Sequence, residues 1–301
     1  MRLFLQFPFI VHGWILSWVP APVFALMGRL LGSWLGLLGF RRMVVRENIR
    51  RAYPGKTEEW RRALENAQYR SLGMLFLEMF RFFGRFSRFL ETRVAVEGEC
   101  HLRAALAEGN GVFVMTAHLG NWEVLPACGA WRLKVPVTIV TKELRPAWLH
   151  DLVERTRGAL GLKMAFEPKT MQRVMRALKS GEIVGFAMDQ YAGAPVGARV
   201  PFFGVPVGSH TALAMLALRT GAPVVPAISW RKPDGSFVCR FEPRLALVSH
   251  GDRDEAVIRN TALFVSYTER WIREFPEQWL WVHRRWKGDL SPLHSAGEML
   301  R

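Results

Sequence analysis

The chain has 301 residues, which is enough for one large α/β domain or two small ones with a substantial core. Hydrophobic residues make up 50% of it, with 12 Trp and 20 Phe, and this composition excludes an intrinsically disordered protein. A formal charge of +15 indicates a polyanionic partner, namely a nucleic acid, an anionic membrane or an acidic carrier, with a basic surface kept for solubility as the alternative.

The amino-terminal segment is apolar. Residues 3–27 contain no Lys, Arg, Asp or Glu, and about 20 apolar residues in a helix cross a bilayer core. Because Pro8, Pro20 and Pro22 interrupt the segment, it fits either one tilted span or a helix lying in the interface. A cleaved signal peptide is the competing interpretation, but Arg2 alone makes a weak basic start and no small-residue cleavage site follows. We therefore expect residues 1–40 to form an uncleaved membrane anchor.

A basic cluster follows the apolar segment. Excess positive charge beside an apolar segment is typical of the cytoplasmic side and offers contacts for anionic membrane lipids. No zinc-finger spacing or RNA-binding signature accompanies it, so nucleic acid is not expected as a partner. The cluster consists of Arg41, Arg42, Arg46, Arg50 and Arg51.

Helical and strand-like segments alternate from there on. Residues 41–90 are predicted to be helical, with Thr57 capping a helix whose first turn carries Glu58 and Glu59. Buried strands are expected near residues 112–117, 136–142, 163–166 and 183–190, with helices at 147–159 and 170–180 between them. This alternation predicts an α/β fold with a mixed, mostly parallel sheet covered by helices on both faces, as one domain over residues 41–301.

The last third of the chain continues this pattern. A loop is expected over residues 191–208, followed by a helix capped by Ser209. The turn "KPDG" should join two strands as a hairpin, and a helix is expected at 254–274.

The sequence "GVFVMTAHLGNWEVL" (residues 111–125) places a histidine at the end of a buried strand. His118 follows the strand, Gly120 lets the backbone or a substrate approach closely, Asn121 can cap the next helix, and Glu123 enters its first turn. Such a strand–turn–helix break can fold the carboxylate of Glu123 back onto the imidazole, which would then act as a general base on an alcohol.

From spacing alone, three interpretations of His118 stay open: a catalytic base, a core histidine, or a metal ligand. Asp189 lies at the end of another strand, where sites form in open α/β sheets. The three cysteines are far apart and show no metal or disulfide spacing, and no serine or cysteine sits in a nucleophile-elbow pattern. A covalent acyl-enzyme is therefore not expected.

Several stretches, taken in order along nearly the whole chain, resemble one family. They are "RENIRRAYPGKTEEWRRALENAQYRSLG" (46–73), "TAHLGNWE" (116–123), "RGALGLKM" (157–164), "LKSGEIVGFAMDQ" (178–190), "VPFFGVPVGSHT" (200–211) and "PEQWLWVHRRWK" (276–287). The family is that of the late lauroyl- and myristoyl-transferring acyltransferases of bacterial lipid A biosynthesis, within the lysophospholipid acyltransferase-like superfamily. The resemblance implies a glycerolipid acyltransferase-like fold.

The resemblance also implies roles for single residues. His118 matches the general base and Glu123 its acidic partner in direct acyl transfer. Arg157 matches a substrate-binding arginine of the family, and Arg155, two positions earlier, is the alternative match. Other residues in matching segments are expected to bind substrate: Asp189, Gln190, Gly120, Asn121, Phe203 and Gly204.

The implied partners are an acyl donor, either acyl carrier protein or acyl-CoA, and a glycolipid acceptor, with a lipid A precursor expected. No metal or bound cofactor is implied. The implied location is the cytoplasmic face of the inner membrane. The alternatives are an acyltransferase for another glycolipid such as phosphatidylinositol mannoside, a non-catalytic lipid-binding membrane protein, and a thioesterase that uses water as acceptor.

Overall fold

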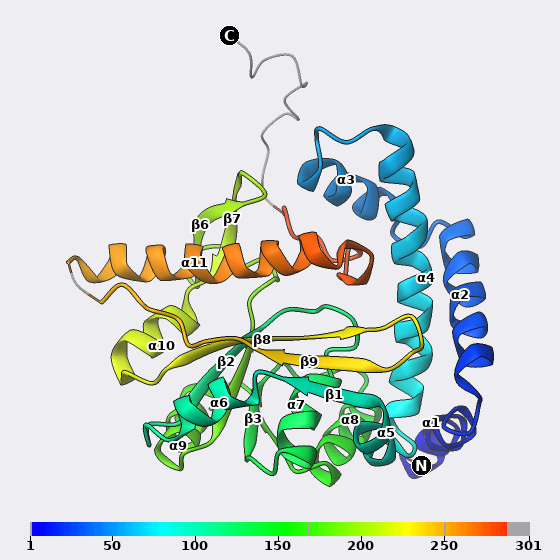
Figure 1. Ribbon diagram of the computed structural model, residues 1–301, viewed down its shortest axis with the longest axis horizontal. Helices are drawn as coiled ribbons and strands as arrows, with labels where there is room; N and C mark the ends of the chain where they lie inside the picture. Colours follow the sequence, from blue (N-terminus) through cyan, green and yellow to red (C-terminus); the bar gives the residue numbers. More distant parts are fainter. Residues whose placement is uncertain (1, 168, 250, 288–301) are drawn as a thin grey trace.

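The computed structural model describes residues 2–167, 169–249 and 251–287 of the chain, so residues 288–301 of the expected 41–301 domain lie outside it. Figure 1 shows a central sheet with a group of amino-terminal helices packed against one end of it.

Seven strands of the described chain form one sheet in the order β1-β9-β8-β2-β5-β3-β4. Every neighbouring pair in it is parallel except β8 and β9, which are joined by the predicted hairpin turn. The predicted mixed, mostly parallel sheet is therefore confirmed. The strands are β1 (Val94–Glu97), β2 (Val112–Thr116), β3 (Val137–Val140), β4 (Leu162–Ala165), β5 (Ile183–Ala187), β8 (Val224–Arg231) and β9 (Phe237–Phe241).

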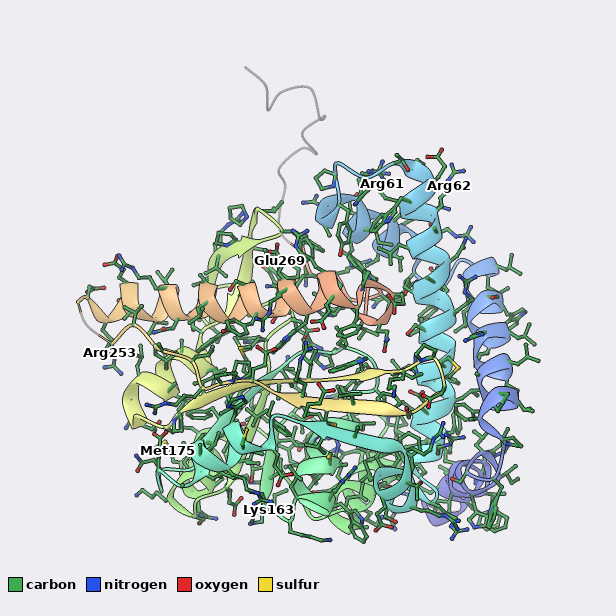
Figure 2. The ribbon with its side chains drawn as sticks, in the orientation of Figure 1. Arg61, Arg62, Lys163, Met175, Arg253 and Glu269 are labelled. Atoms are coloured by element: carbon green, nitrogen blue, oxygen red, sulfur yellow. The ribbon has the colours of Figure 1, made fainter. Side chains whose placement is uncertain are left out.

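Helices cover both faces of the sheet, as expected from strands that are buried on both sides (Figures 1 and 2). Successive side chains of a strand point to opposite faces, so Val112 and Val114 of β2 join one core while Phe113 and Met115 join the other. The first face is covered by α5 (Phe86–Arg93), α6 (Glu99–Leu106), α7 (Val124–Ala127) and the π-helical turn η1 (Cys128–Arg132). The second is covered by α9 (Thr170–Lys179), α10 (Ala212–Thr220) and α11 (Arg253–Glu274).

The remaining helices lie at one end of the sheet or at its edge. Thr57 caps α4 as predicted, because its side-chain oxygen accepts a hydrogen bond from the Trp60 amide at 3.2 Å. These helices are α1 (Arg2–Leu16), α2 (Ala21–Leu37), α3 (Arg42–Ala52), α4 (Glu58–Phe82), α8 (Ala147–Ala159) and the short 3₁₀ turn η2 (Pro276–Gln278).

Glycines allow α2 and α4 to touch along their backbones (Figure 1). A Cβ on Gly32 of α2 would lie 2.0 Å from the Tyr69 carbonyl oxygen, and a Cβ on Gly73 of α4 would lie 2.2 Å from the Gly28 carbonyl oxygen. Small residues spaced four apart permit such close helix pairing. We call this contact the glycine seam.

Large apolar side chains are exposed on α1, on α2 and on residues that follow each of these helices. None of the described helices alone is long and apolar enough to cross a membrane, whereas α2 and α3 together have the length and composition to do so but are bent by 97°. The exposed residues include Phe7, Ile10, Trp14, Ile15, Trp18, Val23, Leu26, Leu30, Trp34, Leu37 and Leu38.

The prediction of a loop over residues 191–208 was wrong from residue 197 onward. This part forms a β-hairpin of β6 (Gly197–Phe202) and β7 (Val205–His210), and Ser209 lies inside β7 instead of capping the following helix. The prolines and glycines that indicated a loop are accommodated because the hairpin is a separate two-stranded sheet, with no third strand beside it in the described chain.

Candidate active site

His118 and Asp189 meet because β2 and β5 are parallel neighbours in register. Thr116 pairs with Ala187 at the ends of the two strands, and each of the two polar residues comes two positions later. Equal offsets past a paired position bring both side chains to the same carboxyl edge of the sheet, where sites form in α/β folds.

The carboxylate of Asp189 holds the imidazole of His118. Its Oδ1 lies 2.8 Å from His118 Nδ1, and its Oδ2 accepts a hydrogen bond from the backbone amide of His118 at 3.0 Å. A proton on Nδ1 satisfies this contact and leaves Nε2 as a hydrogen-bond acceptor. The side-chain amide nitrogen of Gln190 lies 3.5 Å from that Nε2 and can donate to it.

Asp189 stays ionised although it is buried. Its Oδ2 also accepts a hydrogen bond from the indole nitrogen of Trp279 at 2.9 Å. Burial raises the pKa of the Asp189 carboxyl, but the charge and hydrogen bond of His118 and the bond from Trp279 outweigh it and hold this pKa well below its usual range.

Burial lowers the pKa of His118, but the attraction of Asp189, its hydrogen bond and the charge of Glu123 reverse the shift, so that the pKa of His118 is raised above its ordinary 6.5. The imidazole is therefore a stronger base than a free histidine.

A cavity of about 280 Å³ opens beside His118 on one face of the sheet. Three neighbouring strands supply alternate residues to its wall, as expected for side chains that point the same way. The wall is mainly apolar and includes Val114 and Thr116 of β2, Val137 and Ile139 of β3, Ile183, Gly185 and Ala187 of β5, and Leu125, Pro126 and Gly129 beyond them.

Glu123 also lines this cavity, but its partner is not His118. Its two carboxylate oxygens accept hydrogen bonds from Nε and Nη2 of Arg157 at 3.0 and 2.6 Å. The expected bond from Glu123 to the imidazole is thus wrong, since Asp189 occupies that position. The reason is that the turn after His118 directs Glu123 toward α8, and its carboxylate fits the planar guanidinium of Arg157.

Gly120 and Asn121 build the turn that presents His118. A Cβ on Gly120 would lie 3.0 Å from the Ser229 carbonyl oxygen, and its φ of +57° favours glycine. Asn121 is buried, and its Oδ1 accepts a hydrogen bond from the Glu123 amide at 3.1 Å within the turn. The expected cap at Asn121 was wrong, because α7 begins only at Val124, so Glu123 precedes the helix instead of lying in its first turn. The Gly120 amide donates to the Gln278 carbonyl at 2.9 Å, so it is not a free donor for substrate.

The expected substrate-binding residues separate in space. Arg157 and Gln190 lie at the site, whereas Arg155 donates to the side chain of Gln6 and ties α8 to α1. Phe203 and Gly204 form the turn of the β6–β7 hairpin, and the ring of Phe203 packs on Tyr53 and Trp286 instead of lining the cavity.

Two aromatic residues at the site were not anticipated from the sequence. Trp122 lines the cavity, and its ring stands edge-on to that of His118 with centroids 5.0 Å apart. Trp279 comes from the carboxyl-terminal segment. The next residue, Leu280, donates its backbone amide to the His118 carbonyl at 3.2 Å. The "WLW" stretch at residues 279–281 was the only signal for Trp279 in the sequence, and its contact with Asp189 could not be inferred from it.

Among the described residues, no group of three or more His, Cys, Asp or Glu is placed to hold a metal ion.

A family model described as bacterial lipid A biosynthesis acyltransferase matches residues 1–288. The chain belongs to this family. It is 27% identical to the lipid A biosynthesis lauroyltransferase of Escherichia coli over 279 residues, 91% of this chain and 88% of that protein. It is 28% identical to the lipid A biosynthesis palmitoleoyltransferase of the same organism over 284 residues, with the same coverage of both chains.

A more distant group of relatives carries a different name. The phosphatidylinositol mannoside acyltransferase of Mycobacterium tuberculosis is 28% identical over 207 residues, which are 67% of this chain and 62% of that protein. The protein described here is therefore an acyltransferase of the lipid A biosynthesis family, with an acyl donor and a lipid acceptor as its substrates.

Proposed function

We propose that this acyltransferase moves a fatty acyl group from a thioester of acyl carrier protein or coenzyme A to a hydroxyl of a lipid A precursor. The observation that carries the proposal is the pair of His118 and Asp189 at an apolar cavity of about 280 Å³. A base beside an apolar cavity suits a reaction between a hydroxyl and an acyl chain. The names of the Escherichia coli relatives support the lipid A acceptor.

His118 acts on the acceptor hydroxyl in this mechanism. Its Nε2 removes the proton as the oxygen attacks the thioester carbonyl, and the imidazolium is stabilised by Asp189. The tetrahedral intermediate collapses with loss of the thiolate, which takes the proton back from His118. The ester forms and the thioester breaks without an acyl-enzyme. Gln190, whose amide nitrogen is near Nε2, is the donor that we assign to the oxyanion.

In this proposal Glu123 and Arg157 act together as an ion pair. Glu123 is not the hydrogen-bonded partner of the base, and Arg157 is not a substrate anchor. Their bidentate ion pair forms a polar corner of the cavity wall beside the imidazole. The charge of Glu123 also adds to the raised pKa of His118, so Glu123 influences the base through space.

We also propose that residues 1–40 attach the protein to the cytoplasmic face of the inner membrane, with residues from 41 onward as the acyltransferase domain. The exposed apolar side chains of α1 and α2 support attachment, because a large exposed apolar patch marks a membrane or protein contact. The arginines of α3 then lie where anionic headgroups are found.

The acceptor has a second candidate. The mycobacterial relatives are named for acylation of phosphatidylinositol mannoside, so another membrane glycolipid is the alternative. Purified protein supplied with an acyl thioester and either acceptor separates the two by mass spectrometry of the products. Transfer to the lipid A precursor supports the proposal. Equal release of free fatty acid with and without any acceptor would indicate hydrolysis and contradict it.

The pH dependence of the reaction should follow the raised pKa of His118. A general base must be neutral, and a raised pKa keeps the imidazole protonated to a higher pH than in a free histidine. We expect kcat/KM to increase with pH through a limb above 6.5 and to level off beyond it. In Asp189→Asn this limb should move to lower pH, because the attraction that raises the pKa is lost while burial still lowers it.

Gly185 offers a test of the cavity as the acyl site. A Cβ there would meet nothing closer than the Thr138 carbonyl oxygen at 4.0 Å, so a side chain at this position extends into the cavity without a clash at its base. Gly185→Val is expected to shift the preferred acyl chain to a shorter one. Gly158→Val on the exposed surface of α8 is the control, and an unchanged preference in Gly185→Val would place the acyl chain elsewhere.

A further inference from the structure

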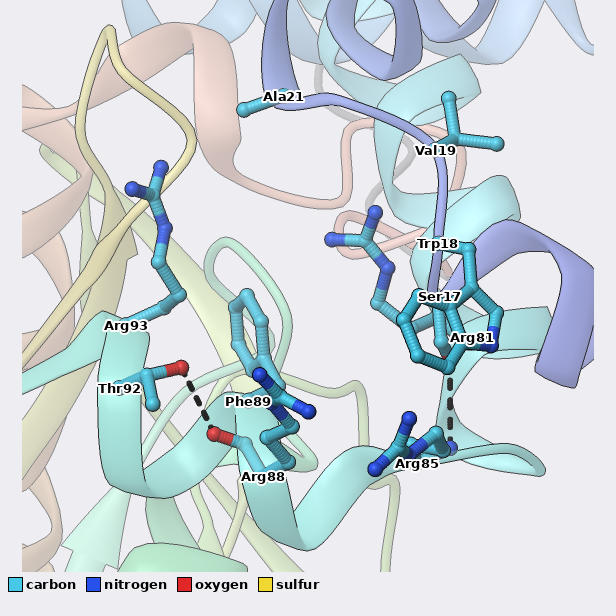
Figure 3. Close-up of a pocket in the computed structure, with 10 residues that line it drawn as sticks. All are labelled: Ser17, Trp18, Val19, Ala21, Arg81, Arg85, Arg88, Phe89, Thr92 and Arg93. Atoms are coloured by element: carbon cyan, nitrogen blue, oxygen red, sulfur yellow. Dashed lines mark hydrogen bonds between the residues drawn. The ribbon is translucent and has the colours of Figure 1, made fainter.

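A second cavity, of about 310 Å³, lies where α1 and α2 join (Figure 3). It shares no lining residue with the cavity at His118. One side of it is formed by the α1–α2 connection and the first residue of α2: Ser17, Trp18, Val19 and Ala21. The other side comes from the end of α4 and from α5 and the residue before it: Arg81, Arg85, Arg88, Phe89, Thr92 and Arg93.

The described residues that line this second cavity include four guanidinium groups and no carboxylate. In the described chain none of Arg81, Arg85, Arg88 and Arg93 forms an ion pair. Two acids on the same helices, α4 and α5, are engaged elsewhere: Glu78 forms a bidentate pair with Arg231, and Glu91 accepts from Trp131.

The contacts that these arginines make within the described chain are to carbonyl groups and aromatic rings and not to carboxylates. Arg81 donates Nη2 to the Leu16 carbonyl at 3.0 Å and lies 3.8 Å from the ring centroid of Phe24, and its buried Nε has no partner. Arg85 stacks over Trp18 at 4.7 Å. Arg93 donates to the Asp234 carbonyl at 2.5 Å, and the Asp234 carboxylate accepts from Ser236. Burial lowers the pKa of Arg81 and the charge of Arg93 adds to this effect, whereas the attraction of Glu78 opposes it only in part.

The surroundings of the cavity are apolar and exposed. Trp18, which forms part of its wall, is 57% exposed, and Trp14, in edge contact with it, is 54% exposed. Tryptophans at this kind of boundary are typical of the headgroup level of a membrane, with arginines beside them. A ligand that satisfies both features carries a phosphate and has acyl chains beside it.

We propose that this arginine cavity binds the phosphate of an anionic membrane phospholipid whose acyl chains lie along the exposed apolar side of α1 and α2. Guanidinium groups contact phosphate oxygens in pairs of parallel hydrogen bonds, which ammonium groups cannot do. The lipid is a ligand and not a substrate, so this site goes beyond the acyl transfer proposed above and is independent of His118.

Binding of the full-length protein to lipid vesicles tests the proposal. The vesicles are phosphatidylcholine alone or phosphatidylcholine mixed with phosphatidylglycerol, and the variant is Arg85→Gln/Arg88→Gln. The control is Arg219→Gln/Arg253→Gln, which loses the same charge on α10 and α11 at the opposite end of the molecule (Figures 1 and 2). Two basic residues near a membrane surface contribute a factor of about ten or more to binding.

We expect the Arg85/Arg88 variant to lose about tenfold or more in affinity for anionic vesicles and little for neutral ones, and the control to lose less than about twofold. Arg85→Lys/Arg88→Lys keeps the charge but not the planar donor pairs, and it should also bind more weakly than the wild type. Full binding by the lysine variant would show a diffuse surface attraction and overturn the cavity as the site. An unchanged melting temperature checks that the variants are folded.

Two further measurements distinguish a phospholipid ligand from a soluble phosphate and from the acceptor substrate. Thermal stabilisation by inorganic phosphate that the variant loses, without any preference for anionic vesicles, would assign the cavity to a soluble phosphate. A raised KM for the acceptor in detergent would assign it to the substrate. Either result overturns the proposal, whereas unchanged kinetics in detergent support it. His118→Ala should bind anionic vesicles like the wild type, so the failure of one proposal leaves the other standing.

Discussion

Replacing His118 with alanine is expected to lower the rate of acyl transfer about 10²- to 10⁴-fold, the usual contribution of a positioned general base. The loss should appear in kcat, because the imidazole acts on the proton in the transition state and the apolar cavity that would hold the acyl chain remains. The measurement is product formation from an acyl thioester and a lipid A precursor. A folded variant with normal turnover would contradict the mechanism.

Asp189→Asn should lower the rate by a similar factor for a different reason. Both oxygens of Asp189 accept hydrogen bonds, from His118 and from Trp279. An asparagine replaces one acceptor with a donor, which either holds the imidazole in the wrong tautomer or faces another donor. Asp254→Asn on the first turn of α11 is the matched control and should keep full activity.

The second large effect is expected on stability. The Glu123 and Arg157 side chains are only 4% and 12% exposed, so removing one partner leaves a charge in an apolar wall. Glu123→Leu or Arg157→Met alone should lower the free energy of unfolding by about 3–5 kcal/mol. The double variant Glu123→Leu/Arg157→Met should regain most of that loss, because an apolar pair of similar volume leaves no unpaired charge.

Denaturant unfolding of the wild type, the two single variants and the double variant gives the interaction energy of the pair. If both single variants lost less than about 1 kcal/mol, the ion pair would behave as a solvated surface pair. The Arg155→Met variant is the control on α8, because Arg155 lies on the same helix but contacts Gln6.

Much of the fold followed from local patterns. The alternation of buried strands with amphipathic helices was sufficient for the α/β sheet, and Thr57 could be recognised as a cap from its place before Glu58 and Glu59. The β6–β7 hairpin could not be recognised, because its prolines and glycines indicate a loop when the pairing of distant residues is unknown.

The titratable residues of the site could be predicted from the sequence, but not which of them are in contact. His118 and Asp189 were each expected at a strand end, but the order of strands decides which acid meets the imidazole, and that order depends on the whole packed sheet. Glu123 is the partner that the short turn after His118 and the family resemblance indicate. Arg157, which lies 34 positions further on, competes for it more effectively since its planar donors match the carboxylate.

The glycine seam has a consequence for which hydroxyl can react. Backbones that touch cannot slide or tilt relative to each other without a steric clash, so α2 and the catalytic domain that contains α4 move as one rigid piece. If α2 rests in the bilayer, the imidazole is held at a constant height above the lipid surface. The distance of a hydroxyl from the membrane surface then selects the site of acylation. A hydroxyl at the height of the imidazole is acylated, and neighbouring hydroxyls above or below it are left unmodified.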